Sequence, residues 1–420
     1  MRTAVPDHLP ERLTVTLWDF SWYVRTAPGD AFADLDGCFA EAVRRGYNTI
    51  RICAMPYLLF GTGIDPSALT FTPLGGEYGQ RTRWYDVKGT ATLDGRQHLL
   101  DLFAAARRHD CYLIVSSWEY QQSPCFLDGP AWADALAAVA PHDRPAALAD
   151  ALADLVDFLA EHGLDDRVAF VELHNEVQVG KLTDVADNRI FALPVLRPLL
   201  EGGIERFKKR HPGQLVTANY AGVPVGHMRH LPENVDVAVF HPYVYGVLDE
   251  LISTYHLRDD EPFDEQRLHR ELLRGGAPPL EEWLPPEPDR WRMRATIMRH
   301  RELYAHDWCD PVKWDRWLYD HYGEHRIAME QKLTMWLDVA RDWAQPRGIP
   351  LVFGEGWVGY TPLLGTFEEG PVGAAFCERA VAESARVGAW GTLVCSNAAP
   401  QHPMWADIDL QQRLNAAFVA

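Results

Sequence analysis

The sequence predicts an α/β protein, a (β/α)8 TIM barrel with long loop insertions after strands 2 and 6. Short apolar segments alternate with amphipathic helical segments almost from end to end of the 420 residues. This alternation is typical of parallel strands joined by helices. Most of the apolar segments are continuous, as expected of strands that are covered on both faces. The segments number eight, which is the number of strands that closes such a barrel.

The predicted strands are spread over the whole chain. In order, they are Leu13–Trp18, Asn48–Cys53, Cys111–Ser117, Val168–His174, Leu215–Asn219, Val235–Phe240, Pro350–Gly354 and Trp390–Ser396. Helices are predicted between them from apolar residues at 3.6-residue spacing. The first runs over 32–43 and ends near Gly46, a residue type that often follows a helix, and later ones cover 148–159 and 329–340.

The chain is longer than an ordinary barrel of this class, which needs about 250 residues. The surplus lies mainly in two predicted loops, 55–94 after strand 2 and 246–322 after strand 6. Because both loops follow strands, they should lie on the C-terminal face, where active sites of this fold are built. We expect a single catalytic barrel over 1–420, with 246–322 as a lid-like insertion.

Composition limits the partners and the location. The formal net charge of −19 argues against nucleic acid or an anionic membrane surface as a partner. The N-terminus lacks the apolar core of a secretory signal, and no stretch of 18 apolar residues occurs. Seven cysteines, odd in number and without CxxC spacing, indicate reduced thiols. We therefore expect a cytoplasmic protein, and the sequence leaves its oligomeric state open.

Two glutamates directly follow apolar strands. Glu176 ends the stretch VAFVELHNE after strand 4, and Glu355 ends IPLVFGE after strand 7. Two carboxyl groups that face each other across a barrel mouth suit glycoside hydrolysis. One is protonated and assists the leaving oxygen, and the other is ionised and attacks the anomeric carbon. Either glutamate alone could equally be a capping or rim carboxylate, but the pair in these positions is much more specific.

Four motifs in the right order resemble those of the retaining glycoside hydrolases of clan A. GYNTIRI lies at strand 2, HNE at strand 4, FHPYVY at strand 6 and FGEGW at strand 7. The nearest relatives by this resemblance are family 5, the cellulases and mannanases, and its cellulase-like members. The resemblance implies that Glu176 is the acid/base and that Glu355 is the nucleophile.

The resemblance also implies roles for residues around the two glutamates. Arg51 would lie beneath Glu355 and keep it ionised, and Tyr243 would donate a hydrogen bond to the same carboxylate. Asn175 would bind the sugar 2-hydroxyl, and His241 would lie near the acid/base. These roles are physically sensible, because an arginine and a hydroxyl donor both favour the charged form of a carboxylate. Arg51 could instead pair with a structural acid, and His-Pro-Tyr is a common start of a loop.

Strand 4 carries a further acid before its polar end. Glu172 alternates with His174, so it can point into the barrel and pair with Arg51 or another cation. We interpret His174 as a supporting or core residue. The chain departs from the family where Val177 follows the acid/base glutamate, because proline is usual there.

Aromatic residues give an independent indication. Flat aromatic faces suit the apolar faces of sugar rings, although large aromatics also pack barrel tops without a ligand. Those at or just beyond predicted strand ends are Trp18, Trp22, Trp84, Trp118, Trp357 and Trp405. The usual sugar-stacking tryptophan of strand 8 is missing, and LVCSNAAPQHPMW offers Asn397, His402 and Trp405 instead. The identity of the substrate therefore cannot be taken from cellulases.

Two further sets of residues have open roles. Arg81 and Arg83, beside Trp84 in GQRTRWYD, either contact a substrate or tie the loop after strand 2 to the barrel. Glu119 is a third rim carboxylate, and it either contacts a substrate hydroxyl or is a solvated charge.

The sequence therefore predicts a retaining β-glycoside hydrolase that acts on a small oligosaccharide or glycoside by double displacement. Its partner is a carbohydrate substrate, and it needs no cofactor and no metal. Two alternatives belong to other classes. One is a carbohydrate-binding barrel without turnover. The other is a metal-dependent sugar isomerase or lyase with Glu176, His241 and Glu355 as ligands.

Overall fold

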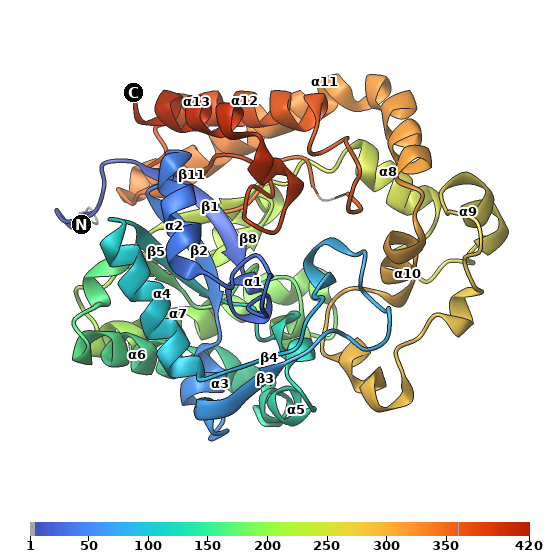
Figure 1. The fold of residues 1–420 in the computed structure, drawn as a ribbon. Coiled ribbons are helices and arrows are strands. Elements are labelled where there is room, and N and C mark those ends of the chain that lie inside the picture. The colour runs from blue at the N-terminus through green and yellow to red at the C-terminus, as the bar shows by residue number, and fades with distance from the viewer. Residues whose placement is uncertain (1–4, 360) are drawn as a thin grey trace.

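The computed structural model describes residues 5–359 and 361–420, which form a (β/α)8 TIM barrel with parallel strands at its centre (Figure 1). The strands are β1 (Leu13–Asp19), β2 (Thr49–Ala54), β5 (Tyr112–Ser117), β6 (Val168–Glu172), β7 (Val216–Thr217), β8 (Asn219–Ala221), β9 (Ala238–His241), β10 (Leu351–Phe353) and β11 (Gly391–Leu393).

The barrel has eight strand positions. The sheet order is β7-β6-β5-β2-β1-β11-β10-β9-β8, so β7 and β8 occupy the two ends of the order. Ala218 alone separates them in the chain, and they are two parts of one strand that pairs with β6 on one side and β9 on the other. All eight predicted strands are present, within a few residues of the predicted bounds.

Helices surround the strands. The bounds are α1 (Ser21–Val24), α2 (Leu35–Arg44), α3 (Pro56–Phe60), α4 (Gly95–Arg108), α5 (Ala131–Ala138), α6 (Arg144–Glu161), α7 (Ala192–Arg210), α8 (Val247–Thr254), α9 (Glu265–Glu271), α10 (His300–Trp308), α11 (Pro311–Ala344), α12 (Pro371–Arg386) and α13 (Ile408–Val419). Several begin at an aspartate whose carboxylate accepts hydrogen bonds from the first turn. Asp94 does so for α4 and Asp310 for α11.

Two connections are long. The segment between β2 and α4 contains α3 and a short antiparallel pair, β3 (Leu69–Phe71) and β4 (Ala91–Leu93). The segment between β9 and α11 contains α8, α9 and α10, and in Figure 1 it lies to one side of the barrel, away from the two chain ends. Asp307 of α10 joins the two segments, because its carboxylate accepts hydrogen bonds from the amides of Gly79 and Arg81.

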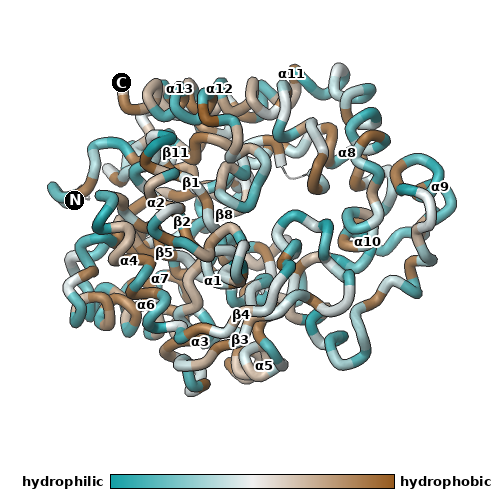
Figure 2. The backbone as a smooth tube through the Cα atoms, in the orientation of Figure 1, coloured by the Kyte–Doolittle hydropathy of each residue, from teal (hydrophilic) through white to brown (hydrophobic). Residues whose placement is uncertain are grey.

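The strands are buried throughout, and their side chains make two apolar clusters. A smaller cluster of strand residues, including Val15, Ile114, Phe170 and Val239, contains no buried residue from the long helices. The larger cluster packs strands against helices, and Figure 2 shows hydrophobic and hydrophilic residues alternating along the outer helices. With the strand interior apolar in this way, polar side chains near the C-terminal strand ends need partners of their own.

All seven cysteines are buried and unpaired, as expected of reduced thiols. Within the ranges that the structure describes, no helix combines the length and apolar character needed to cross a membrane.

Candidate active site

A buried network begins at Arg51, near the middle of β2. Its guanidinium donates to Glu172 at the end of β6, with 2.6 Å between Nη2 and Oε2. Its Nη1 lies 2.6 Å from Oε1 of Glu355, which follows β10. Nη2 also donates to Oδ1 of Asn175 over 2.7 Å. One arginine of β2 therefore holds two carboxylates and an amide from the ends of two other strands, β6 and β10, in fixed positions.

Asn219, in β8, extends this network to the backbone of Glu176. Its Nδ2 donates to Glu172 Oε2 over 2.7 Å, and its Oδ1 accepts the Glu176 amide over 2.5 Å. Glu176 has φ 43°, a left-handed conformation that is unfavourable for a residue with a side chain and persists only where neighbours impose it. The Val177 amide donates to the Asn219 carbonyl over 3.1 Å. A proline at position 177 would lack this N–H, which gives a physical reason for the departure from the family pattern.

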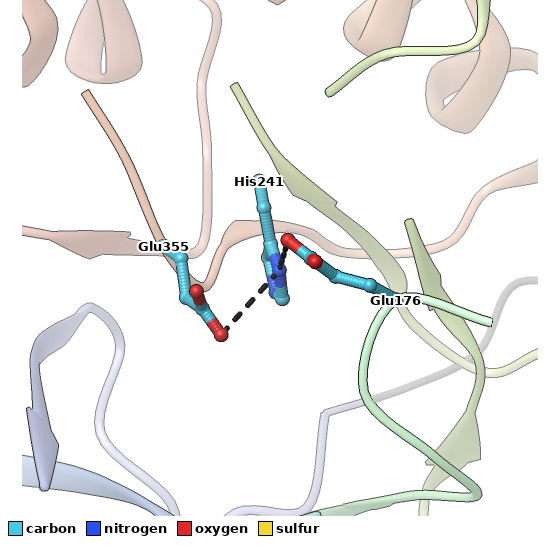
Figure 3. Close-up of side chains that lie close together, drawn as sticks. All are labelled: Glu176, His241 and Glu355. Carbon is cyan, nitrogen blue, oxygen red and sulfur yellow. Dashed lines mark hydrogen bonds and ion pairs between the residues drawn. The ribbon is translucent and has the colours of Figure 1, made fainter. Parts of the chain in front are cut away.

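The side chains of Glu176 and Glu355 converge on His241, the last residue of β9 (Figure 3). His241 Nδ1 lies 3.1 Å from a Glu176 oxygen and 3.6 Å from a Glu355 oxygen. One carboxylate oxygen of each glutamate and the imidazole nitrogen all lie within 4.8 Å of one another. Tyr243 donates its hydroxyl to the other oxygen of Glu355 over 2.9 Å.

The two glutamates have different environments. Burial raises the pKa of Glu176 well above its usual value, and the nearby charge of Glu355 raises it further. Burial also raises the pKa of Glu355, but the Arg51 charge and the hydrogen bonds from Tyr243 and Arg51 oppose that rise. The pair therefore favours a protonated Glu176 beside an ionised Glu355, because only Glu355 has a cation in contact.

His241 and Tyr243 remain neutral near pH 7. Burial and the Arg51 charge lower the pKa of His241 well below its usual value. Burial and the two glutamates raise the pKa of Tyr243 well above its usual value. His241 therefore accompanies the pair as a neutral imidazole, and Tyr243 stays a hydrogen-bond donor.

A pocket of ≈ 530 Å³ opens over this centre. The centre contributes Asn175, Glu176, Tyr243 and Glu355 to its lining. The connections after β2, β5, β6 and β8 contribute Trp84, Trp118, Gln121, Gln122, Val179, Arg189, Ala221, Gly222 and Val223. The segment between β9 and α11 contributes Tyr245, Asp249, Arg258, Ile297, Met298, Arg299 and Glu302, and α11 contributes Lys332 and Trp336.

The predicted tryptophans divide between pocket and core. Trp84 and Trp118 line the pocket, and the indole N–H of Trp118 has no partner among the described residues. Trp18 is fully buried, with its ring 4.7 Å from that of Phe39. Trp18 does not line the pocket because successive side chains of a strand point to opposite faces, and its own points toward the helices.

Three more of the tryptophans that the sequence suggested for sugar binding do not line the pocket. Trp357 is fully buried against Phe353. Trp405 follows strand β11, but its ring lies under the Arg45 guanidinium at 4.0 Å and beside Tyr47. The chain has turned back along the outside of the barrel by this point, so Trp405 contacts residues that precede β2. Trp22, likewise, packs in the core against His98.

Asn397 and Arg83 belong to a second buried charge cluster. Arg83 forms ion pairs with Glu369 and, at 3.5 Å, with Glu368, and Asn397 donates to Glu368. Arg83 also donates to the carbonyl of Thr361. Of the two roles considered for Arg83, the structure shows the one that ties the loop after β2 to the rest of the barrel.

Glu119 is neither solvated nor directed into the pocket that contains Glu176. It is buried and accepts hydrogen bonds from the amides of Tyr57 and Leu58 and from the Trp132 indole. These amides belong to the first turn of α3, so Glu119 acts as a helix cap. Burial raises its pKa to about 7.

Several residues of the site were missed from the sequence. Asn219 is the last residue of the predicted strand Leu215–Asn219 and was not considered for the site, and Gln121 accepts the Asn175 side-chain amide over 3.0 Å. Trp336 and Lys332 lie in a helix whose apolar spacing indicates a core-facing role. The feature of the sequence that could have indicated these two residues is the length of their helix, because α11 spans 34 residues and passes beside the pocket.

Glu176, His241 and Glu355 also have the residue types and the spacing of a metal site. Glu355 is already paired with Arg51 and Tyr243, and a permanent cation at 2.6 Å disfavours a divalent ion beside it. The three residues supply three ligand atoms. One of these atoms belongs to the Glu176 carboxyl group, which burial favours in its protonated form.

Residues 15–192 match the family described as "Cellulase-like: Sugar-binding cellulase-like". The matched part contains Arg51, Asn175 and Glu176, and it ends before His241 and Glu355. Over these residues the chain is similar to this cellulase-like family, in agreement with the resemblance that the motifs before residue 192 indicated. A search of curated proteins returns no match.

Two solved structures show the same fold. A protein from Parabacteroides distasonis ATCC 8503, provisionally assigned as a glycoside hydrolase, is 19% identical and has a TM-score of 0.67, with 97% of this chain and 93% of that chain covered. A GH5-4 broad specificity endoglucanase from an uncultured bacterium is 10% identical and has a TM-score of 0.50, with 97% and 94% covered. The chain is thus similar to both in its barrel fold along nearly its whole length.

Proposed function

We propose that the protein is a retaining β-glycoside hydrolase that acts on a small oligosaccharide or glycoside. The observation that carries the proposal is the pair Glu176 and Glu355, which present carboxylate oxygens within 4.8 Å of each other. Retaining enzymes place their two carboxyl groups about 5–5.5 Å apart, whereas inverting enzymes need about 6.5–9.5 Å to admit a water molecule. The short separation supports double displacement.

In the first step, the Glu176 carboxyl group gives its proton to the glycosidic oxygen as the bond from that oxygen to the anomeric carbon breaks. A Glu355 oxygen forms the new bond to the anomeric carbon. In the second step, water gives a proton to Glu176 and attacks the same carbon, and the bond to Glu355 breaks. The anomeric configuration is retained after two inversions.

The surrounding residues have roles in this sequence that follow from their contacts. Arg51 keeps Glu355 ionised before attack, and Tyr243 donates to the oxygen that Arg51 does not contact. Asn175 lines the pocket beside Glu176, where its amide can bind a sugar hydroxyl. Trp118 offers an indole N–H, and Trp84 an aromatic surface, in the lining of the same pocket.

The size and boundary of the pocket support a short substrate. The segment between β9 and α11 forms one side of the pocket. Within this segment, Arg258 and Glu302 form an ion pair at 2.5 Å. A wall of this kind closes a groove at one end, which suits a glycoside or short oligosaccharide better than the middle of a polymer. The range 246–322 predicted as a lid-like insertion includes the first turns of α11 (Pro311–Ala344), and we retain the lid-like interpretation of the range as part of this proposal.

The test uses a panel of nitrophenyl β-glycosides with wild type, Glu355→Gln and, as a matched control, Glu369→Gln. Glu369 is also paired with an arginine, but it does not line the pocket. We expect Glu355→Gln to lower kcat/KM by more than about 10³-fold, because a nucleophile is lost. Glu369→Gln should keep the rate, and the first product detected by NMR should have the β configuration.

Four outcomes would contradict the proposal or its test. Equal loss in both variants would indicate damage to the fold, and an α-configured first product would indicate inversion. Sugar binding by calorimetry without turnover of any glycoside would favour the carbohydrate-binding alternative. The metal-dependent alternative, which the spacing of Glu176, His241 and Glu355 favours, predicts loss of activity on dialysis against EDTA and recovery with a divalent cation. The glycosidase proposal predicts no change on dialysis.

A further inference from the structure

One wall of the pocket is formed by α11 and by the residues after β8. Lys332 and Trp336 lie one turn apart on α11, and both line the pocket. Gly222 lies against Trp336, since a Cβ atom there would be 3.2 Å from the indole Cη2. Gly222 has φ 63°, which a residue with a side chain rarely adopts. The Trp336 indole therefore packs against position 222, where glycine fits better than a residue with a side chain.

This wall is attached to the chain segment that carries Glu176. Gln178 donates to the Ala221 carbonyl over 2.8 Å and accepts the Ala221 amide over 3.2 Å. The Gly222 amide donates to the His241 carbonyl over 2.7 Å. In the proposed mechanism, Glu176 protonates the leaving group, and Glu355 forms the bond to the other sugar. We therefore infer that the wall that adjoins Glu176 contacts the leaving group.

Two cations that line the pocket have no ion-pair partner among the described residues. One is Lys332 of this wall, whose Nζ lies 4.5 Å from the centre of the Trp336 ring, and the other is the exposed Arg189 from the connection after β6. The other two cations that line the pocket are paired, Arg258 with Glu302 and Arg299 with Asp260. Cations without an ion-pair partner in the pocket of a chain with net charge −19 indicate a ligand that is itself negative.

Asp249 is an acid of the pocket that lies near Lys332. It lines the pocket from α8, and the charge of Lys332 opposes the rise that burial causes in the pKa of Asp249, although the described residues show no ion pair between the two side chains. One carboxylate opposite two cations leaves the wall with a positive charge. A neutral sugar would gain nothing from that charge, whereas a carboxylate or phosphate would receive charge-assisted hydrogen bonds.

We propose that the leaving group of the substrate carries an anionic group, a carboxylate or a phosphate, which Lys332 and Arg189 bind while Trp336 packs against an apolar face of that leaving group. The inference rests on the proposed glycosidase function, because Glu176 defines the leaving-group side. Trp336 and Lys332 are specificity residues in this scheme, and the reacting bonds are made and broken by the two glutamates.

The experiment compares leaving groups that differ in charge at one position. The substrates are the β-D-glucosides and β-D-mannosides of 4-hydroxybenzoate, of its methyl ester and of 4-hydroxyphenyl phosphate. The enzymes are wild type, Lys332→Gln, Lys332→Arg and Arg326→Gln. Arg326 is an exposed cation of α11 outside the pocket lining and serves as the matched control. For each enzyme, the ratio of kcat/KM for the anionic glycoside to that for the ester is measured.

We expect a ratio of about ten in wild type, the effect of one charge-assisted contact. The ratio should fall to about one in Lys332→Gln and should persist in Lys332→Arg and Arg326→Gln, because the arginine variant keeps the charge. The carboxylate and phosphate arms identify which anion fits. Ratios near one for both anions in wild type would overturn the inference and leave the glycosidase proposal standing.

A second measurement does not depend on turnover. Calorimetric titration of Glu355→Gln, alone and combined with Lys332→Gln, with the same glycosides measures the preference for the anion as a ratio of Kd values. A preference that Lys332→Gln removes would support the anion site even if no glycoside were hydrolysed, in which case the glycosidase proposal alone would fail. Equal Kd values for ester and anions, or no binding of any anionic glycoside, would overturn the inference.

Discussion

Two buried arginines each hold two glutamates, but in different regions of the barrel. Arg51 contacts Glu172 and Glu355 from within β2, and Arg83 contacts Glu368 and Glu369 from the long loop after β2. Both guanidinium groups are fully buried.

The two clusters differ in what surrounds them. The Arg51 cluster joins strand ends and adjoins Glu176 and the pocket, whereas the Arg83 cluster joins the loops after β2, β10 and β11. The chemistry of a buried arginine between two acids therefore does not identify a site. The position relative to strand ends and an open pocket distinguishes a cluster that adjoins the proposed catalytic pair from one that fixes loops.

Replacing Arg51 should have the largest effect of any change to these clusters. Arg51→Met removes the cation from Glu172 and Glu355 together and leaves two carboxyl groups buried without it. We expect the free energy of unfolding to fall by about 3–5 kcal/mol, the usual cost of removing one partner of a buried ion pair. Glu355 should then hold a proton, and kcat/KM on nitrophenyl glycosides should fall by more than about 10³-fold. Activity near wild type would show that Arg51 does not control the charge of Glu355.

Replacing Arg83 should separate stability from catalysis. Arg83→Met should also lower the free energy of unfolding by about 3–5 kcal/mol, because Glu368 and Glu369 lose their cation. At a temperature where the variant is folded, its kcat should remain within a few fold of wild type. Denaturant titration and initial rates on the same sample check both statements. A loss of kcat as large as that of Arg51→Met would mean that the two clusters do not differ in function.

Much of the Arg51 cluster was predictable, whereas the Arg83 cluster was not. Arg51, Asn175, Glu176, His241 and Glu355 follow or belong to parallel strands, and the ends of parallel strands meet at one edge of a barrel. Sequence order along such strands therefore predicts which residues meet.

The order of loops along the chain does not predict which of their residues meet. Glu368 and Glu369 lie more than 280 residues after Arg83, in the connection after β10, and nothing in the local sequence indicates the contact. Trp18 shows the limit even for strands. A shift of one residue in the assumed strand end reverses the face to which a side chain points.

Removing the hydroxyl of Tyr243 tests a finer part of the Arg51 cluster. In Tyr243→Phe, Glu355 keeps Arg51 but loses the hydrogen bond to its second oxygen. A hydrogen bond to a charged group contributes about 1.5–3 kcal/mol, so kcat/KM should fall by roughly 10- to 100-fold. Burial and the neighbouring glutamate charges raise the pKa of Tyr243 well above 10, so its deprotonation should not contribute to the pH profile below pH 9. Tyr245→Phe is the control, because it changes a tyrosine of the same pocket whose ring lies beside that of Tyr243 and against the Arg258 guanidinium.

The smallest effect should come from Glu368, the acid that shares Arg83 with Glu369. Burial raises the pKa of Glu368 from 4.5 to about 7, so the folded protein binds a proton that the unfolded chain releases near pH 4.5. The stability contributed by this proton is present below pH 4.5 and is lost as the pH rises through about 7.

Glu368→Gln mimics the protonated form at every pH, so wild type should lose stability relative to the variant between pH 5 and 7, by no more than about 2 kcal/mol. Because Asp19, Glu119 and Asp307 also titrate in this range, the difference between the two proteins is the quantity to measure, by urea titration at each pH. A difference that grows in the opposite direction would mean that Arg83 keeps both of its glutamates ionised. The Arg83 cluster would then match the Arg51 cluster in leaving a charged carboxylate beside its cation.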